Sequence, residues 1–278
     1  MQLQAYLDRI GYAGPVRADF ETLARIHKHH LLNIPYENID VQFGRTVSLD
    51  IEPVFDKIVN RCRGGWCYEM NGLLAWALEE IGFSVQKLSG GVMRETRGDA
   101  ALGNHLVLLV NISGTQYLTD VGYGDGLFEP VPLTPGLIVQ RGLQMELQQI
   151  DDGYWRFRNH MFGAAPSFDS NLLPAQTRLL QRQCDRLQTD ADSPFKLALV
   201  CQTFTADGIE VQLGRLSKSI NRNGVVTVLL DSPEQLITRL EQVFGIDEPE
   251  IRNLWPAIVA RHEEFLNDDV PSQSASTC

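Results

Sequence analysis

A cysteine stands at the start of a long apolar pattern, in a position that suits a nucleophile. In the segment RCRGGWCYEMNGLLAWALEEIGF, residues 61–83, Cys67 follows Gly64 and Gly65 and precedes a predicted helix. A thiol in the first helical turn lies near free backbone N–H groups and the positive end of the helix dipole, which favour the thiolate. We interpret Gly64-Gly65 as a flexible hinge that presents this nucleophile. The alternative is that Cys67 is a small core hydrophobe, as most cysteines are.

A histidine and an aspartate in a predicted hairpin are the partners that such a thiol needs. If Ser113-Gly114 is the two-residue loop of the segment GNHLVLLVNISGTQYLTDVGYG, His105 faces Gly122 and Val107 faces Asp120. His105 and Asp120 are then diagonal neighbours on one face, about 7–8 Å apart. A carboxylate that orients an imidazole allows the imidazole to take the proton of a cysteine. The alternative is an ordinary salt link between the two.

Helices are predicted on both sides of Cys67. Apolar residues at helical spacing predict one helix near residues 3–10, a second near 20–31 that ends before Pro35, and a third near 70–81 that ends at Gly82. We expect His29 and His30 to lie on the solvated face of the second helix.

Strand patterns follow and favour an antiparallel barrel or sandwich. Three hairpins are predicted, with the strand pairs HLVLLVNI and TQYLTDV, LQMELQQI and YWRFRNH, and FKLALVCQTFT and IEVQLGRL. Ser232-Pro233-Glu234-Gln235 then begins a C-terminal helix, with Ser232 as its cap. The polar end NDDVPSQSASTC is expected to be a frayed tail.

Composition limits the class of protein. The chain has 278 residues, 44% of them hydrophobic, and a net charge of −11, which argues against broad nucleic-acid binding. We find no apolar run long enough to span a membrane and no export signal in the chain as given. Five scattered cysteines favour reduced thiols in a cytoplasm over a disulfide framework. Neither these cysteines nor the three histidines near residue 30 have metal-site spacing, so no metal is expected.

These motifs together resemble the arylamine N-acetyltransferases of bacterial type. The resemblance runs from YLDRIGYAG to the last helices and is carried by IPYENID, RGGWCYEMNGLL, the Asn-His of GNHLVLLV, and YLTDVGYG. It implies a triad of Cys67, His105 and Asp120. The implied fold is α+β with several domains: an N-terminal helical bundle (1–84), a central antiparallel β-barrel (85–190) and a C-terminal α/β lid (191–278), around a cysteine-protease-like core.

The resemblance also implies the reaction. Acetyl-CoA, the co-substrate, gives its acetyl group to Cys67, CoA leaves, and an arylamine, arylhydrazine or related acceptor takes the acetyl group in a ping-pong mechanism. The protein would act as a monomer or weak homo-oligomer, without nucleic acid or membrane partners.

Further residues take roles from their positions in these motifs. The acceptor pocket would include Tyr36, Tyr123 and Phe204, and the CoA-binding turns would include Asn104, Tyr123 and Gly124. Glu37 and Arg63 are expected to be a structural charge pair. Both tyrosines stand where the family usually has Phe, which leads to the hypothesis that acceptors are more polar. Candidates for CoA phosphate contacts are Lys218, Arg215 and Arg222.

Two other functions remain open. A hydrolase of the papain or transglutaminase type would use the same three residues but resolve the acyl-enzyme with water or a peptide amine. A non-catalytic binding protein would keep the fold with an inactive site, because fold alone does not give function.

Overall fold

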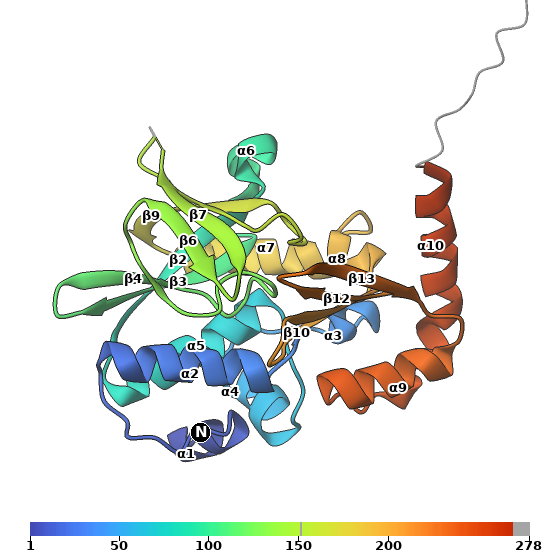
Figure 1. Ribbon diagram of the computed structural model, residues 1–278, viewed down its shortest axis with the longest axis horizontal. Helices are drawn as coiled ribbons and strands as arrows, with labels where there is room; N and C mark the ends of the chain where they lie inside the picture. The colour runs from blue at the N-terminus through green and yellow to red at the C-terminus, as the bar shows by residue number, and fades with distance from the viewer. Residues whose placement is uncertain (151, 269–278) are drawn as a thin grey trace, which may run out of the picture.

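The computed structural model describes residues 1–150 and 152–268 of the chain. Helices of the N-terminal part lie below a large antiparallel sheet, and a second sheet with the C-terminal helices lies beside them (Figure 1). Among the described residues, no helix is long and apolar enough to cross a membrane. The three-part division at residues 84 and 190 and the cysteine-protease-like core stay predictions.

The N-terminal helices form where apolar spacing predicts them. They are α1 (Leu3–Arg9), α2 (Phe20–Asn33), α3 (Ile39–Gln42), α4 (Ile51–Phe55), the π-helical turn η1 (Asp56–Asn60) and α5 (Cys67–Ile81). Gly82 ends α5 in the left-handed region, with φ 102°, which a glycine adopts without steric cost. α5 is surrounded by other elements, and ten of its residues are buried.

The expectation that His30 is solvated was wrong. His30 is fully buried, and its Nδ1 atom lies 2.9 Å from the hydroxyl of Tyr6 on α1. Even His29 is only half-exposed, with Nδ1 3.1 Å from the carbonyl oxygen of Ile10. The reason is that neighbouring elements cover α2 on more than its apolar stripe. Tyr6 and Ile10 each provide a partner for one imidazole nitrogen, while Nε2 of His30 has no hydrogen-bond partner among the described residues.

The larger sheet is antiparallel and curled. Its strands pair in the order β5-β4-β3-β2-β9-β8-β7-β6. They are β2 (Ser84–Val92), β3 (His105–Ile112), β4 (Thr115–Thr119), β5 (Val131–Pro132), β6 (Gly136–Gln140), β7 (Leu143–Gln149), β8 (Trp155–Arg158) and β9 (Ser167–Pro174). Strand pairing thus leaves β5 and β6 as edges among the described strands. The side chain of Gln140 on β6 joins the two ends, since it accepts hydrogen bonds from the backbone N–H groups of Phe128 and Glu129.

The smaller sheet connects distant parts of the chain. Its order is β1-β10-β11-β12-β13, and β1 (Tyr36–Glu37) comes from the N-terminal region. The other strands are β10 (Val200–Phe204), β11 (Ile209–Leu213), β12 (Leu216–Asn221) and β13 (Gly224–Leu229). The antiparallel pairing of Tyr36 with Gln202 therefore ties the segment before the nucleophile to the C-terminal part.

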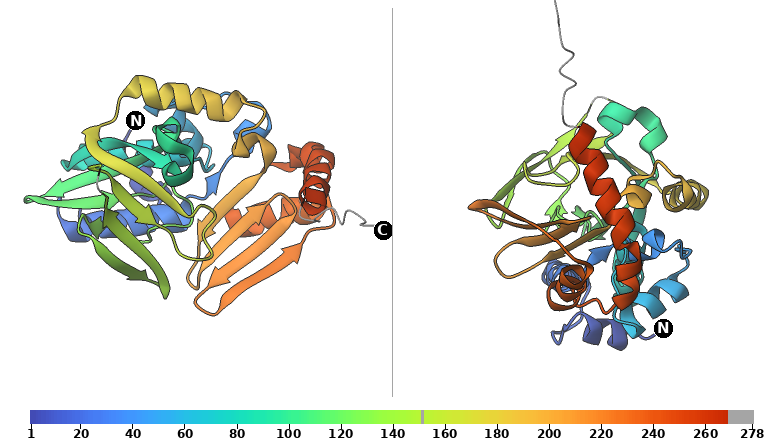
Figure 2. Two further views of the ribbon diagram at one scale, coloured as in Figure 1. Left: turned by 90° about the horizontal axis from the view of Figure 1, so that it is seen from above. Right: turned by 90° about the vertical axis from the view of Figure 1, so that its right-hand side faces the viewer.

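The remaining helices pack around the sheets (Figure 2). They are α6 (Arg94–Arg97), η2 (Gly98–Ala101), α7 (Thr177–Thr189), α8 (Pro194–Leu197), α9 (Pro233–Phe244), η3 (Pro249–Leu254) and α10 (Trp255–Asp268). The predicted cap of α9 is confirmed, because Ser232 Oγ accepts from the N–H of Gln235 at 3.3 Å. The predicted tail overlaps the end of α10 at residues 267–268, and its other residues, 269–278, lie outside the described ones.

All three predicted hairpins form, with several strands shorter than expected and β10 the most shortened. In the first, Ile112 pairs with Thr115 and Leu108 with Thr119, as predicted, and Ser113 and Gly114 both have positive φ. This is the turn that a two-residue hairpin loop needs. The predicted pairs His105–Gly122 and Val107–Asp120 lie beyond the last pair of this ladder. In the third hairpin, Ser193 caps α8, so the strand predicted from residue 195 begins at residue 200.

Candidate active site

Cys67 is the first residue of α5, where the sequence predicts it. Trp66 precedes it as the N-cap in an extended conformation. The cysteine is 3% exposed, and its Sγ atom lies 3.9 Å from the carbonyl oxygen of Asn104. The first N–H groups of an α-helix have no intrahelical acceptor, so the sulfur stands beside a local positive potential.

Gly64 and Gly65 form a packed junction, which corrects the interpretation of a flexible hinge. Both glycines are buried, and neither has a positive φ. A Cβ atom on Gly64 would lie 2.0 Å from the carbonyl oxygen of Pro35, so only glycine fits there. Gly65 bonds through its N–H to Pro35 and through its carbonyl to the N–H of Glu37. These contacts fix the path of the chain into Cys67.

His105 and Asp120 lie together in the buried interior. β4 ends at Thr119, and the side chain of Asp120 turns toward the start of β3. The Nε2 atom of His105 lies 2.7 Å from Oδ2 of Asp120, and both residues are 2% exposed. The prediction that these two residues are neighbours is confirmed, and their side chains are in direct contact.

Asn71 holds the other oxygen of Asp120, a role that the sequence analysis missed. Its Nδ2 atom donates to Oδ1 of Asp120 at 2.7 Å, and the backbone N–H of Gly122 donates to the same oxygen at 2.8 Å. Asn71 lies one helical turn after Cys67 on α5, so both side chains share one face. The spacing Cys-x-x-x-Asn is the signal that was available.

The environment of His105 favours its protonated form. Burial disfavours the imidazolium, but the Asp120 carboxylate and the Cys67 thiol outweigh burial and raise the pKa of His105 to about 10. Because Nε2 binds Asp120, Nδ1 is the nitrogen left for the sulfur. An imidazolium beside a cysteine stabilises the thiolate, so the arrangement can hold a nucleophilic sulfur at neutral pH.

A second buried histidine supports the segment that carries Asp120. The ring nitrogens of His27 on α2 each lie 3.1 Å from a backbone carbonyl oxygen, Nε2 from that of Asp120 and Nδ1 from that of Phe128. Burial lowers the pKa of His27 to about 4, despite these hydrogen bonds. His27 therefore lies between both ends of the segment 120–128, and its neutral ring has one N–H to donate to one of the two carbonyl oxygens.

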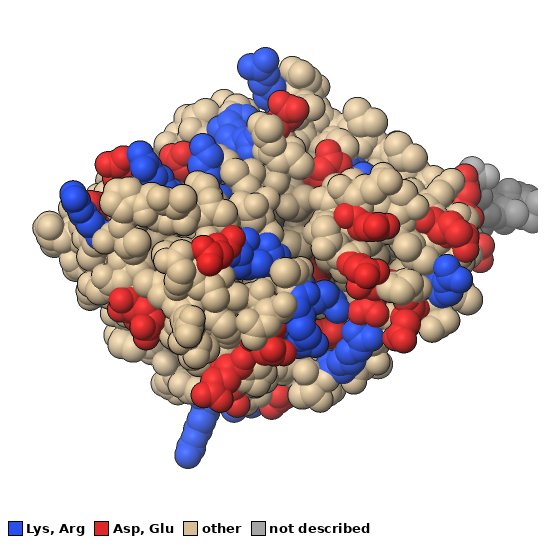
Figure 3. Space-filling view, turned by 90° about the horizontal axis from the view of Figure 1, so that it is seen from below, with Lys and Arg blue, Asp and Glu red and all other residues tan. Residues whose placement is uncertain are grey.

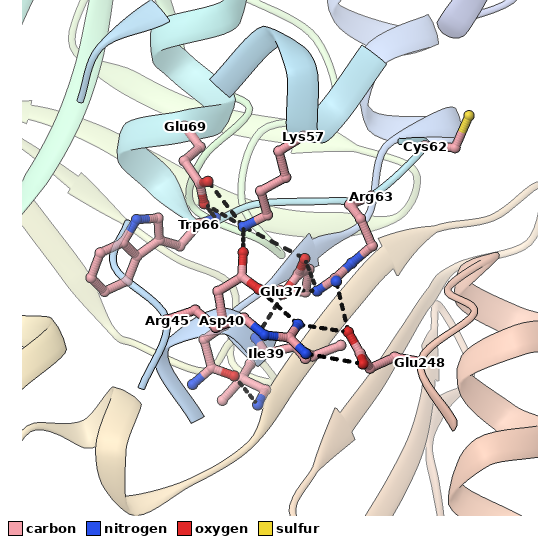
Figure 4. Close-up of polar contacts among 12 residues, drawn as sticks. Glu37, Ile39, Asp40, Arg45, Lys57, Cys62, Arg63, Trp66, Glu69 and Glu248 are labelled. Carbon is pink, nitrogen blue, oxygen red and sulfur yellow. Dashed lines mark hydrogen bonds and ion pairs between the residues drawn. The ribbon is translucent and has the colours of Figure 1, made fainter. Parts of the chain in front are cut away.

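A buried charge cluster anchors the start of α5 (Figure 4). Glu69 Oε2 accepts from the N–H of Trp66 at 3.1 Å, and Oε1 lies 2.9 Å from Lys57 Nζ. Lys57 Nζ also lies 2.8 Å from Asp40, and Lys57 is 5% exposed. Burial opposes the charge on Lys57, but the surrounding carboxylates raise its pKa.

The predicted pair of Glu37 and Arg63 is confirmed and extends this cluster. Arg63 Nη2 lies 2.9 Å from Glu37, and its Nη1 lies 2.9 Å from Glu248, the residue before η3. Arg45 also binds Glu248, at 2.8 Å. The cluster therefore connects the start of the nucleophile helix with the C-terminal part of the chain.

Tyr36 and Tyr123 both lie next to the triad. The ring centroid of Tyr123 is 5.4 Å from that of His105, and its hydroxyl donates to the carbonyl oxygen of Ala165 at 3.2 Å. Tyr36 is buried, and burial together with the nearby Cys67 raises its pKa well above the usual range. The hydroxyl of Tyr123 thus has a backbone partner.

Asn104, Gly124 and Phe204 each contact a different part of the structure. The side chain of Asn104 bonds both backbone groups of Val92, so its amide positions the turn before His105. A Cβ atom on Gly124 would lie 1.8 Å from the side-chain oxygen of Gln202, so close packing requires glycine there. Phe204 packs against Phe128 at a centroid distance of 5.3 Å.

Asp125 is a second buried carboxylate that the sequence analysis missed. It accepts hydrogen bonds from Asn159, the N–H of Ala164 and Gln202 at 2.9, 2.7 and 3.1 Å. Burial raises its pKa, although these donors oppose the shift. Its position within the Gly-rich segment Gly122–Gly126 was the available signal.

The three cations predicted to contact the CoA phosphates differ in their partners and exposure. Arg215 binds the carbonyl oxygen of Leu230, lies 3.6 Å from Asp231 and is thus engaged, whereas Arg222 is exposed beside Gly142. Lys218 is half-buried on β12. Within residues 1–150 and 152–268, no group of three His, Cys, Asp or Glu side chains is arranged to hold a metal.

Comparisons with known proteins identify the family of this chain. The family model described as N-acetyltransferase matches residues 19–250. The pineal gland isozyme NAT-3 of arylamine N-acetyltransferase from Gallus gallus is 30% identical over a match of 274 residues. The match covers 88% of this chain and 94% of that protein. The chain therefore belongs to the arylamine N-acetyltransferase family, and it is an enzyme of the transferase class.

Solved structures of the family share the whole fold. The Mycobacterium smegmatis arylamine N-acetyltransferase superimposes with a TM-score of 0.82 at 33% identity, covering 95% of this chain and 98% of that one. The Mycobacterium marinum enzyme, solved in complex with CoA, superimposes with a TM-score of 0.83 at 28% identity, covering 93% of this chain and 98% of that one.

Proposed function

We propose that this enzyme transfers an acetyl group from acetyl-CoA to the nitrogen of arylamines, arylhydrazines or related acceptors, by a ping-pong mechanism through acetyl-Cys67. The observation that carries the proposal is the buried arrangement of Cys67, His105 and Asp120 at the start of α5, with His105 and Asp120 2.7 Å apart. Family membership supports the acetyl donor and the class of acceptor.

In the first half-reaction, the Cys67 sulfur bonds to the carbonyl carbon of the thioester. The bond from that carbon to the CoA sulfur breaks, and the leaving thiolate takes a proton from His105. CoA leaves as the thiol, and the enzyme keeps an acetyl-Cys67 thioester with a neutral His105. N–H groups in the first turn of α5, where intrahelical acceptors are lacking, would stabilise the oxyanion.

In the second half-reaction, the amine nitrogen bonds to the acetyl carbon. The bond from that carbon to Cys67 breaks, and neutral His105 takes the proton that the nitrogen loses. The thiolate and the imidazolium are restored, and the N-acetyl product leaves. Arylamines suit this step because their nitrogens are largely unprotonated at neutral pH.

The supporting residues have distinct proposed roles. Asp120 orients His105 and stabilises its positive charge, and Asn71 positions Asp120. Tyr36, Tyr123 and Phe204 line the acceptor side, and the turns that contain Asn104, Tyr123 and Gly124 contact CoA. Cys62, Cys67, Cys184 and Cys201 are free thiols, which suits the reducing cytoplasm that we propose as its location.

Steady-state kinetics test this function. With acetyl-CoA and aniline varied together, double-reciprocal plots should be parallel, and CoA release should depend on the amine. CoA release at the same rate without amine would instead indicate a hydrolase. Absence of CoA release from folded protein would favour the non-catalytic alternative.

A further inference from the structure

An open groove lies where α2, the β6–β7 turn and the β10–β11 turn meet. It has a volume of about 630 Å³, and its lining includes Lys28, Phe128, Arg141 and Ala206. Two cations face the ring of Phe128, with the guanidinium carbon of Arg141 4.4 Å and Lys28 Nζ 5.5 Å from its centroid. The groove therefore has an aromatic floor between two positive side chains.

Arg141 occupies a backbone conformation that its side chain does not favour. Arg141 and Gly142 have φ values of 54° and 81°, which is the two-residue turn that usually begins with Asn, Asp or Gly. A long side chain at the first position is an uncommon choice with a steric cost.

The guanidinium of Arg141 is also short of partners. Its Nη2 atom donates to the carbonyl oxygen of Ala206, but its buried Nη1 atom has no hydrogen-bond partner among the described residues. Burial lowers the pKa of Arg141, and the nearby Asp207 only partly offsets this. By contrast, Arg156 lies 2.7 Å from Asp169, and its pKa is raised. A partly covered cation without a bound anion suits an anionic ligand.

The groove shares Phe128, Gln140 and Arg141 with the lining of a second cavity. Gly126 and Phe128 line a small cavity that adjoins the groove and also contains Arg141 and Phe204. A Cβ atom on Gly126 would lie 3.0 Å from the ring of Tyr123, the ring that packs on His105. The segment 120–128 thus supplies Phe128 to the groove and Tyr123 to the surroundings of His105.

We propose that this groove binds the phosphate groups of the acetyl-CoA donor, with Arg141 as the principal contact and Lys28 as the second. This inference rests on the proposed function. Exposed Arg222 lies beside Gly142, the second residue of the β6–β7 turn. Glu129 and Asp207 also border this region, and acidic and basic side chains are interspersed over the face seen in Figure 3. Direct hydrogen bonds from Arg141, rather than long-range attraction, should thus dominate.

A donor without phosphates separates this role from catalysis. Acetyl-pantetheine carries the same thioester arm as acetyl-CoA but ends before the phosphates. In Arg141→Gln, the KM for acetyl-CoA should rise about tenfold, the size expected for a lost charge-assisted hydrogen bond. The KM for acetyl-pantetheine should stay unchanged. Arg17→Gln, an exposed arginine between α1 and α2, is the matched control and should change neither value.

Binding of 3′,5′-ADP by calorimetry tests the groove without any acyl transfer. The wild type and Arg17→Gln should bind it equally, and Arg141→Gln and Lys28→Gln should bind it more weakly. An unchanged affinity in Arg141→Gln, or an equal rise in KM for both donors, overturns the inference. Loss of transfer from both donors with 3′,5′-ADP binding intact would instead count against the proposed function alone.

Discussion

Asp120 binds His105 with one carboxylate oxygen and Asn71 with the other, at distances of 2.7 Å each. Asn71 and Cys67 lie on the same helix, so α5 positions both the sulfur and the carboxylate that orients the imidazole. The geometry of the site thus depends on one helix packed against one hairpin.

The Asp120→Asn variant should lose acyl transfer and shift its pH dependence. The carboxylate is a main cause of the raised pKa of His105, about 10 in the folded protein. Since the imidazolium is needed as the acid, the wild-type rate should fall as pH rises through about 10. In Asp120→Asn this fall should move to lower pH, and kcat/KM should decrease about 10³–10⁴-fold. Rates of CoA release from pH 6 to 11 measure both, and an unmoved alkaline limb would contradict the account.

Burial of neutral His27 should make the protein sensitive to acid. Its pKa of about 4 in the folded state lies below the ordinary 6.5, so the unfolded chain binds more protons between these values. Stability should therefore fall as pH decreases from 6.5 toward 4, by about 3 kcal/mol from this group. Urea unfolding at pH 7 and 4.5 measures the loss. His27→Gln should lose less between these pH values than the control His262→Gln, and equal losses would show that His27 is not the cause.

Lys57 should be essential for stability because three carboxylates surround it. In Lys57→Met, Glu69 would remain buried without its cation and half-buried Asp40 would lose its nearest one, at a cost of about 3–5 kcal/mol in the free energy of unfolding. Adding Glu69→Gln should recover part of this loss. Arg25→Met breaks an exposed pair with Glu21 and should cost less than about 1 kcal/mol. Urea unfolding compares them, and equal effects of Lys57→Met and Arg25→Met would contradict the role given to Lys57.

Alanine should destabilise the protein at Gly64 and stabilise it at Gly72, only eight residues later. In Gly64→Ala the new Cβ atom would overlap the carbonyl oxygen of Pro35, at 2.0 Å, so the junction before Cys67 must shift. We expect lower stability and slower alkylation of Cys67 by iodoacetamide. Gly72→Ala places a Cβ in open space within α5 and should stabilise the protein by up to about 1 kcal/mol. If Gly64→Ala matches the wild type in both measurements, the junction is a hinge after all.

The sequence predicted those features that depend on local periodicity and turn chemistry. The helix that begins at Cys67, the hairpin around Ser113-Gly114 and the cap at Ser232 each follow from neighbours along the chain, and all are confirmed. The closeness of His105 and Asp120 followed from that hairpin register.

Features that depend on distant contacts were not predictable in the same way. Position 64 must be glycine because the carbonyl oxygen of Pro35, 29 residues earlier in the chain, lies against it. The burial of His30 depends on Tyr6, which belongs to another helix. The partner of Phe204 is Phe128, brought close by the meeting of two sheets. Such relations arise from tertiary packing, which leaves no periodic pattern in one sequence.

The central claim is that Cys67 carries the acetyl group between donor and acceptor. Intact-protein mass after brief exposure to acetyl-CoA, without amine, tests it most directly. We predict a gain of one acetyl group in the wild type, no gain in Cys67→Ala, and loss of the group when aniline is added. An unmodified wild type that remains folded, or an equal gain in Cys67→Ala, would contradict transfer through this cysteine.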